Sequence, residues 1–330
     1  GDKKVLQSTA LCQHYENLDF DSMQVWGFRT LQLGHTLQSV EGQMNGHYYI
    51  GMSWYRMSNL DSAFHHLRAS SALNSEVDNP ERQAGILNAI GITYFNEGLM
   101  THALSHYLDA LEIAEEINDS TILTVSLNNI GNVHFTEENF EDALVYHERS
   151  LKISTGLKNT FRIASSNNNI GLVYREWGQF DKALSYFETA KQLAIEMQSD
   201  FGIGLTMNNI AACYAGQDDW AKALEIHLEI IPYREITQDD YGLAYTYSNI
   251  ANCYLSLGQN KKSLEYAKLS MEIAKKVGGR SLFSNAYKQL ADSYESVGNH
   301  KAALYNYQKF WRYSDSLNND DLTRSLTEME

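Results

Sequence analysis

The histidines are the first residues of this chain whose spacing could support chemistry. His102 and His106 stand four residues apart on a predicted helix, which places both imidazoles on one face, as in a metal-binding pair. The spacing fixes no acidic or cysteine partner beside them, and Tyr107 reads as the packing residue of that helix. His65 and His66 are adjacent and therefore face different directions. The histidines alone predict no metal site.

The three cysteines, Cys12, Cys213 and Cys253, are odd in number and far apart in the sequence. Cys213 and Cys253 are forty residues apart on an apolar helix face, which indicates buried reduced thiols. Such thiols favour a cytoplasmic protein, with a periplasmic sensor region as the alternative. No glycine-rich phosphate loop follows a predicted strand, and no nucleophile has an identifiable base. The sequence therefore predicts no catalysis by this chain and no cofactor.

Asparagine is the residue type whose repetition predicts binding. Pairs recur at forty-residue intervals as Asn128-Asn129, Asn168-Asn169, Asn208-Asn209 and Ser248-Asn249. An asparagine amide offers both a donor and an acceptor, which suits the unpaired N–H and C=O groups of an extended peptide. The open alternative is that these amides bond to carbonyls of the adjacent helix and set the spacing between repeats. We expect one asparagine of each pair to be structural and the other to face a ligand.

Hydrogen bonds alone cannot supply the affinity. A net gain of about 0.5–1.5 kcal/mol for each of roughly four or five amides is only a few kcal/mol, whereas micromolar binding requires roughly 8 kcal/mol. Side chains that differ between equivalent positions must add the rest and set specificity, and these are Phe95, Phe135, Arg175, Leu255 and Glu295, with Tyr247, Tyr287 and Lys288 nearby. The predicted ligand contacts are Asn88, Asn128, Asn129, Asn132, Asn168, Asn169, Arg175, Asn208, Asn209, Tyr247, Asn249, Asn252 and Lys288.

These residues belong to a repeat with a period of forty residues. Ile170, Gly171 and Tyr174 show its first part: an apolar residue, then a small one, then an aromatic three positions later, all on one helix face. His134 takes the aromatic position in the preceding unit, where we expect it to pack. A second helix is marked in the same register by Ala63, Ala103, Ala143, Ala183, Ala223, Ser263 and Ala303. Seven units keep this register without an insertion.

Turn formers and caps separate the predicted helices. Glycine is the usual residue after a helix end, and it is found here as Gly98, Gly178, Gly258 and Gly298. Residues that accept hydrogen bonds from a first helical turn stand between the units as Asn79-Pro80, Asn118-Asp119, Asn159, Ser199-Asp200 and Asp239-Asp240. Each unit therefore contains two helices, and neither can bury its apolar face without the neighbouring units.

Gly171, Tyr174, Gly178 and Ala183 at this spacing resemble the tetratricopeptide repeat, a pair of antiparallel helices. The family's usual unit has about 34 residues, so a forty-residue unit implies longer helices. The usual proline at the unit's end is missing from nearly every repeat. The resemblance covers residues 5–312 and implies an all-α, right-handed superhelical solenoid of about eight antiparallel helix pairs. We expect residues 1–45 to form a degenerate first repeat, 46–312 the regular array and 313–330 a terminal helix.

The resemblance also carries an expectation about function. In proteins that this chain resembles, the first helices line a concave groove. Asparagines at the matching positions hold the backbone of the ligand in kinesin light chain and in chaperone-binding repeats. The resemblance therefore implies a protein or peptide as the partner.

The charge of the chain limits its other partners. A net charge of −15 argues against nucleic acid, which requires a basic surface. Residues 261–312 carry a local excess of Lys and Arg, which we interpret as a solvated face rather than a docking patch. No run of about 18 apolar residues predicts a membrane span, and the start Gly-Asp-Lys-Lys lacks the apolar segment of a signal peptide. We expect the chain to be a piece of a longer protein.

The pattern changes after Trp311 and Arg312. Ser314-Asp315-Ser316 predicts a helix cap, and the helix after it aligns Leu317, Leu322, Leu326 and Met329 in one stripe. This stripe predicts either a cap on the last repeat or the start of a coiled-coil connector, through which the chain could dimerise. Tetratricopeptide sensors of bacteria have a similar segment before a helix that leads to an output domain. This looser resemblance implies a signalling region with an output domain linked after Glu330.

Three functional hypotheses follow from these patterns. The leading one is the peptide-binding regulatory sensor region of a bacterial signalling protein. The second is a passive scaffold or adaptor for the assembly of a protein complex. The third is a peptide-regulated phosphatase of the Rap type, for which residues 1–45 are too short to form the N-terminal three-helix bundle.

Overall fold

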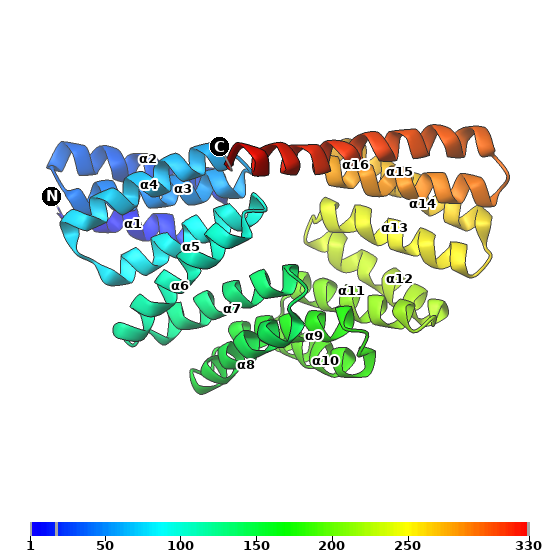
Figure 1. Cartoon of the computed structure of the whole chain (residues 1–330), viewed down its shortest axis with the longest axis horizontal. Helices are drawn as coiled ribbons and strands as arrows, with labels where there is room; N and C mark the ends of the chain where they lie inside the picture. Colours follow the sequence, from blue (N-terminus) through cyan, green and yellow to red (C-terminus); the bar gives the residue numbers. More distant parts are fainter. Residues whose placement is uncertain (1, 17–18, 329–330) are drawn as a thin grey trace. The chain divides into compact units, whose positions relative to one another are not determined.

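The computed structural model describes residues 2–16 and 19–328, and it contains only helices over these ranges (Figure 1). The helices are α1 (Asp2–Tyr15), α2 (Phe20–Leu37), α3 (Val40–Arg56), α4 (Leu60–Val77), α5 (Pro80–Asn96), α6 (Met100–Glu116), α7 (Ser120–Thr136), α8 (Phe140–Gly156), α9 (Thr160–Glu176), α10 (Phe180–Glu196), α11 (Asp200–Gly216), α12 (Trp220–Ile236), α13 (Asp240–Ser256), α14 (Asn260–Val277), α15 (Arg280–Ser296) and α16 (His300–Glu328). The predicted all-α fold of helix pairs is confirmed.

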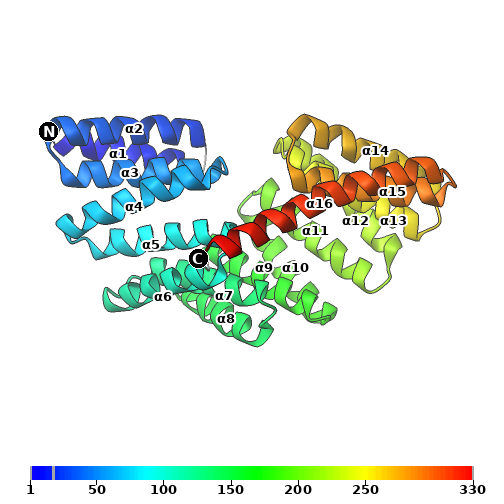
Figure 2. The same ribbon diagram turned by 45° about the horizontal axis from the view of Figure 1, so that its top comes forward.

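The chain forms two compact units, residues 1–157 with α1–α8 and residues 158–330 with α9–α16. Within each unit, consecutive helices run antiparallel and pack side by side, as both views show (Figures 1 and 2). First helices of neighbouring pairs also touch, since α5 contacts α7 and α13 contacts α15. None of the described helices is both long enough and apolar enough to cross a membrane.

The predicted caps start the helices between units. Asp119 accepts hydrogen bonds from the backbone amides of Thr121 and Ile122 at 2.8 and 2.9 Å. Asn79 accepts one from Arg82 at 2.9 Å, with Pro80 at the first position of α5. The equivalent bonds run from Arg162 to Asn159, from Gly202 to Ser199 and from Gly242 to Asp239. The side chains satisfy amides that have no partner inside the helix.

Left-handed backbone ends the helices at intervals of twenty residues. Four of these positions within units are the predicted glycines Gly98, Gly178, Gly258 and Gly298, which have φ values of 80°, 75°, 71° and 76°. Glu138 stands at an equivalent position with a φ of 61° and without glycine's freedom from Cβ clashes. The turn geometry is therefore kept even where the residue type does not favour it.

A small residue on the first helix of a pair faces a large side chain on the second. A Cβ added to Gly171 would lie 2.6 Å from Cε1 of Phe187, and one added to Gly131 would lie 2.6 Å from the ring of His147. Phe187 and His147 are fully buried. In the pair α13–α14, the positions in register are Ala251 and Ala267, which share one core cluster. At Gly131 and Gly171 the missing Cβ leaves space for the ring, whereas in the pair α11–α12 Ala211 stands in register with the buried ring of His227.

Two core positions of this kind hold histidine. His147 and His227 are buried in register with Phe187. Burial disfavours the charged imidazole and lowers the pKa of each to about 4. Both side chains are therefore neutral in the folded chain near pH 7.

The three cysteines are free and buried, as the sequence predicted. Burial raises the pKa of each thiol to about 11. Cys213 lies on the buried face of α11, and Cys253 lies on the buried face of α13. They are packing residues and not reactive thiolates.

The C-terminal helix corrects one prediction. α16 runs without a break from His300 to Glu328, so the predicted cap at Ser314-Asp315-Ser316 is wrong. A cap requires that the chain enter a helix there, whereas the amide of Ala302 already bonds to Asn299 at the true start. The side chains of Leu317, Leu322 and Leu326, and all of Met329, lie outside the described residues. The connector and the dimer therefore stay predictions.

The fit between Gly171 and Phe187 can be tested by substitution. We expect Gly171→Ala to destabilise the second unit by about 1–3 kcal/mol through overpacking, less any gain in helix propensity. In a Phe187→Ala background the added methyl group has space, so its cost should vanish or reverse. The measurement is the free energy of unfolding in urea for both single variants and the double variant. Equal effects of Gly171→Ala in both backgrounds would contradict the proposed contact.

The buried histidines predict a pH dependence of stability. Their folded pKa of about 4 lies below the unfolded value of about 6.5, so the unfolded chain binds more protons and stability falls as the pH is lowered through this window. From pH 7 to pH 5, each histidine should cost roughly 2 kcal/mol. The double variant His147→Phe/His227→Phe should lose much less stability over that range. His300→Gln, at an exposed position, serves as the control, and the same loss in both variants would reject the assignment.

Candidate functional site

The asparagines of the first helices bond to one another along the stack. Nδ2 of Asn209 on α11 donates to Oδ1 of Asn168 on α9 at 2.8 Å. Two further amide bonds follow the same rule, from Asn129 to Asn88 at 3.2 Å and from Asn249 to Asn208 at 3.2 Å. In each case the second position of a pair donates to the first position one unit earlier. The amides thus connect the first helices of successive repeats, which lie within the same compact unit.

Other polar groups join this row of amides. Asn88 is buried and donates to the carbonyl of Ala84 and to Oγ of Ser126, at 3.1 and 2.9 Å. Nδ1 of His147 lies 3.2 Å from Oδ1 of Asn128, which fixes it as the donor. Nη1 of Arg175 donates to Oδ1 of Asn209 at 3.3 Å, and its Nη2 pairs with Glu176 at 2.5 Å. One predicted specificity residue, Arg175, is therefore part of the row.

The hydrogen bonds show which asparagines connect neighbouring first helices. Asn208 accepts from Asn249 while Asn209 donates to Asn168, so both members of this pair bond between helices. Their partners are side-chain amides, whereas the sequence suggested backbone carbonyls. An asparagine amide has two donor hydrogens and an oxygen with two lone pairs, so one bond leaves further capacity. Asn168 and Asn208 are half-buried, which leaves part of each amide at the surface.

The remaining predicted contacts lie apart from these amide bonds. Asn169 and Asn132 are half-buried, and Asn252 is exposed. The ring of Tyr247 lies 5.9 Å from that of Tyr266, and burial raises its pKa. Lys288 is exposed and pairs with Asp292 at 2.9 Å.

An apolar cavity of about 270 Å³ opens beside the amides in the second unit. Its lining combines Asn168 and Asn169 with Phe161, Met197, Phe201 and Leu205. Phe161 is 70% exposed and Phe201 is 55% exposed, although large aromatic side chains are normally covered. The cavity therefore offers an uncovered apolar surface next to hydrogen-bonding groups, which is typical of a binding site.

The exposed aromatic residues form a series that the sequence interpretation missed. Phe161, Phe201 and Tyr241 occupy the first turn of α9, α11 and α13 at forty-residue spacing, and Tyr241 is 49% exposed. In the first unit, Glu81 and Thr121 stand in the same register. The signal was present as aromatics at a helix start, outside the apolar stripe that packs the pair. Phe161 and Phe201 also line the cavity described above, whereas Tyr241 does not.

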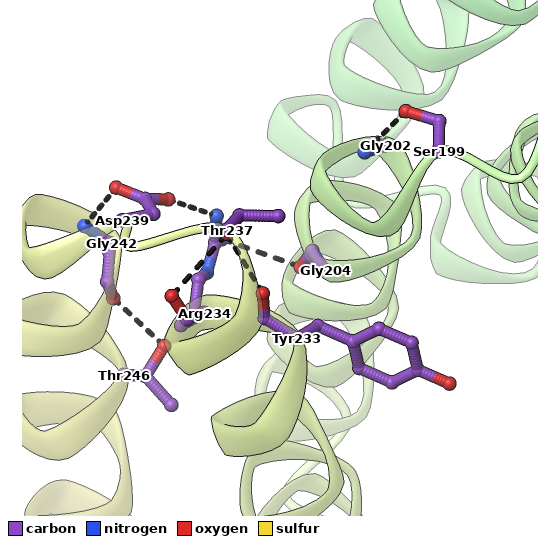
Figure 3. Close-up of polar contacts among 9 residues, drawn as sticks. All are labelled: Ser199, Gly202, Gly204, Tyr233, Arg234, Thr237, Asp239, Gly242 and Thr246. Atoms are coloured by element: carbon purple, nitrogen blue, oxygen red, sulfur yellow. Dashed lines mark hydrogen bonds and ion pairs between the residues drawn. The ribbon is translucent and has the colours of Figure 1, made fainter.

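A buried ion pair fixes the neighbouring helices (Figure 3). Arg234 on α12 is 7% exposed, and its Nη1 pairs with Asp239 at 2.5 Å while its Nη2 lies 3.4 Å from the carbonyl oxygen of Gly204. Asp239 also caps α13 through the amide of Gly242. Because Arg234 contacts both α11 and the start of α13, it joins the two first helices that carry Phe201 and Tyr241. Loss of one partner of a buried pair is strongly destabilising, so Arg234 and Asp239 depend on each other at this junction.

The histidines that could suggest a metal site have aromatic neighbours instead. His102 and His106 both stack on Tyr94, at ring-centroid distances of 5.2 and 5.4 Å. His134 stacks on Tyr146 at 5.3 Å, which confirms its predicted packing role. Over the described residues, no three His, Cys, Asp or Glu side chains gather where they could hold a metal ion.

The family follows from the repeat itself. A family model described as the tetratricopeptide repeat matches residues 82–156, 120–196, 162–236, 202–276 and 242–309, which together span more than half of the chain. The chain belongs to the tetratricopeptide repeat family. Its forty-residue units and the exposed aromatics on the first helices are thus features of one member of that family.

Solved structures show the same fold at low sequence identity. A Rap protein complexed with Competence and Sporulation Factor is 15% identical with a TM-score of 0.68, and the match covers 97% of this chain and 100% of that one. The apo quorum sensor NprR from B. thuringiensis is 15% identical with a TM-score of 0.72, covering 94% and 86%. A STAND signal-transduction ATPase with a tetratricopeptide repeat sensor from Pyrococcus horikoshii is 16% identical with a TM-score of 0.70, covering 94% and 48%. No curated protein matches the sequence significantly.

The amide bonds between successive repeats predict an energetic coupling. We expect Asn168→Ala and Asn209→Ala to be coupled by about 1 kcal/mol in a double-mutant cycle, because they remove the two ends of one hydrogen bond. Asn168→Ala and Asn249→Ala, which share no bond, should be additive and serve as the control. The measurement is the free energy of unfolding in urea. Additivity of the first pair would show that the amide bond contributes nothing measurable.

Proposed function

We propose that this chain is a protein- or peptide-binding module whose ligand lies extended across α9, α11 and α13. The observation that carries this proposal is the apolar cavity between Phe161 and Phe201, which lies directly beside Asn168 and Asn169. The cavity can take an apolar side chain, and the amides can bond to the backbone next to it. Tyr241 stands at the equivalent position of α13, one repeat later, and is 49% exposed.

The two kinds of contact divide the work of recognition. The amides retain bonding capacity after their bonds to each other, and each added hydrogen bond contributes about 0.5–1.5 kcal/mol. Burial of an apolar side chain in the cavity contributes about 25 cal/mol for each Å² removed from water, or roughly 2–3 kcal/mol for a large side chain. The aromatic residues therefore select an apolar anchor, and the amides accept any sequence at the positions around it.

Contacts between the first helices support the binding of an extended chain. Amide bonds link α9 to α11 and α11 to α13, and Arg234 contacts both α11 and the start of α13. A preformed row of contacts avoids the cost of ordering the protein when the ligand binds. Most of the entropic cost of binding then comes from ordering the peptide.

We further propose that ligand binding serves a regulatory role in a bacterial signalling protein. Structures with this fold include a Rap protein in complex with Competence and Sporulation Factor, a quorum sensor and an ATPase with a repeat sensor. At this level of identity the shared property is the fold, and the regulatory role is an inference from it. A passive scaffold would use the same surface without a change in α16. A Rap-type phosphatase is the third hypothesis, and phosphatase activity of the purified chain on a response regulator would support it.

The proposed surface can be tested with a random-peptide display library selected on the immobilised chain. We expect selected peptides to share one apolar residue and to bind at least tenfold more weakly to Phe201→Ala, because the anchor loses one wall of its cavity. Ile236→Ala is the matched control, since Ile236 is 67% exposed on the second helix α12. Affinities are measured by fluorescence polarisation with each purified variant.

Two outcomes of that experiment would be decisive. Equal binding to wild type, Phe201→Ala and Asn168→Ala would place the ligand elsewhere and reject the proposal. With a selected peptide in hand, hydrogen exchange of α16 distinguishes the sensor from the scaffold, because only a sensor requires the terminal helix to respond.

A further inference from the structure

The first unit contains a cavity of different chemistry. It has two adjacent parts, of about 290 and 440 Å³, whose linings share Glu16, Tyr48, Gly85, Thr121 and Ile122. The walls come from the end of α1 and from α3, α5 and α7. No residue of the second unit takes part, so this cavity is independent of the surface proposed above for peptides.

The larger part contains charged groups of both signs, two carboxylates and one guanidinium. Glu16, Glu81 and Arg82 line it, together with the polar side chains of Gln13, Asn79 and Thr121. Glu81 is exposed, whereas Glu16 is half-buried, so the pair with the least access to water is Glu16 and Arg82. The guanidinium of Arg82 lies over the ring of Tyr48 at 4.8 Å and over that of Tyr49 at 5.8 Å, which orients its plane. In the described part of the chain, Glu16 and Arg82 make no ion pair with each other.

The positive charges near Glu16 do not fully compensate for the burial of its carboxyl group. Burial raises the pKa of its carboxyl group, and the positive charges of Arg82 and Arg56 only partly offset this. A partly buried carboxylate is stabilised most by a positive group that makes direct hydrogen bonds. A ligand ammonium group inside the cavity would provide such contacts.

The smaller part of the cavity is mainly apolar. Met52, Ala89, Ile92 and Val125 line it, and Asn88 and Asn129 stand at its edge. Gly85 creates the space, because a Cβ built on it meets no atom within 4 Å. At the same register, later units carry Val125, Ser165, Leu205 and Tyr245. Gly85 lines both parts, so a side chain at this position would occupy space in the cavity.

We propose that this cavity binds a free α-amino acid with an apolar side chain. The α-ammonium group lies against the carboxylate of Glu16, the α-carboxylate against the guanidinium of Arg82, and the side chain enters the part lined by Met52, Ile92 and Val125. Inserted between the two charges, the zwitterion pairs with both. Opposite charges attract more strongly in a partly desolvated cavity than in water. The volume lies in the range of about 300–1,000 Å³ that is typical of small-molecule sites.

The first test uses isothermal titration calorimetry of the whole chain with L-leucine, L-methionine and L-phenylalanine. At least one should bind, and its amide, which lacks the carboxylate, and its deaminated acid, which lacks the ammonium group, should each bind at least tenfold more weakly. The proposal would be overturned if none of the apolar amino acids, at about 10 mM, gave either heat of binding or thermal stabilisation. Equal binding of the amide or the acid would also overturn it. A dipeptide that binds more tightly than either of its free amino acids would mean that a peptide end is the ligand.

The second test removes the site without unfolding the chain. Glu16→Gln and Arg82→Gln should each weaken binding at least tenfold while circular dichroism stays unchanged. Gly85→Val should abolish binding, because its side chain fills open space in the cavity. Gly156→Val is the matched control, since a Cβ at Gly156 also meets no atom within 4 Å but lies outside the cavity. Unchanged binding to Gly85→Val would overturn the proposal, and loss of peptide binding in the second unit would leave it standing.

Discussion

The stack depends on the close approach of one small residue on each first helix to one side chain on its paired second helix. Gly91, Gly131 and Gly171 have Tyr107, His147 and Phe187 directly against them, with no space for a methyl group. Because this fit recurs every forty residues, it fixes where each helix pair crosses and how closely the two helices lie. The left-handed residues at twenty-residue intervals follow from it, since each turn must return the chain to the same register.

This constraint makes one part of each unit invariant and leaves another part free to vary. Residues against the paired helix are small, aromatic or aliphatic, whereas residues on the free side of the first helix differ between units. The asparagines fall between these two classes. Their amide bonds extend the helix-to-helix order from the apolar interior to the surface, where Asn168 and Asn208 are half-buried. A ligand would therefore meet polar groups whose positions are already set by the fold.

Much of the fold could be predicted from the sequence because its signals are local and repeated. Caps such as Asp119 and turn glycines such as Gly178 act over three or four residues, and the period places each in its unit. The continuity of α16 could not be predicted, because Ser314-Asp315-Ser316 has the same composition as a true cap. Nor could the partners of the asparagines, since bonds such as Asn209 to Asn168 depend on the lateral offset of two helices. The aromatic series at Phe161, Phe201 and Tyr241 could be recognised from its forty-residue spacing, but it lies outside the apolar stripe that predicts packing.

The two units illustrate how one backbone supports different sites. At the register position of Gly85, a missing side chain opens a cavity with Glu16 and Arg82 at one end. Three repeats later the same position is Leu205, which lines an apolar cavity together with Phe161 and Phe201. Neither change touches the contact between the paired helices, so neither alters the period. Changes of charge and size on the free side of the first helices can therefore create a site for a small zwitterion in one unit and for an apolar peptide anchor in the other, while the packing of every pair stays the same.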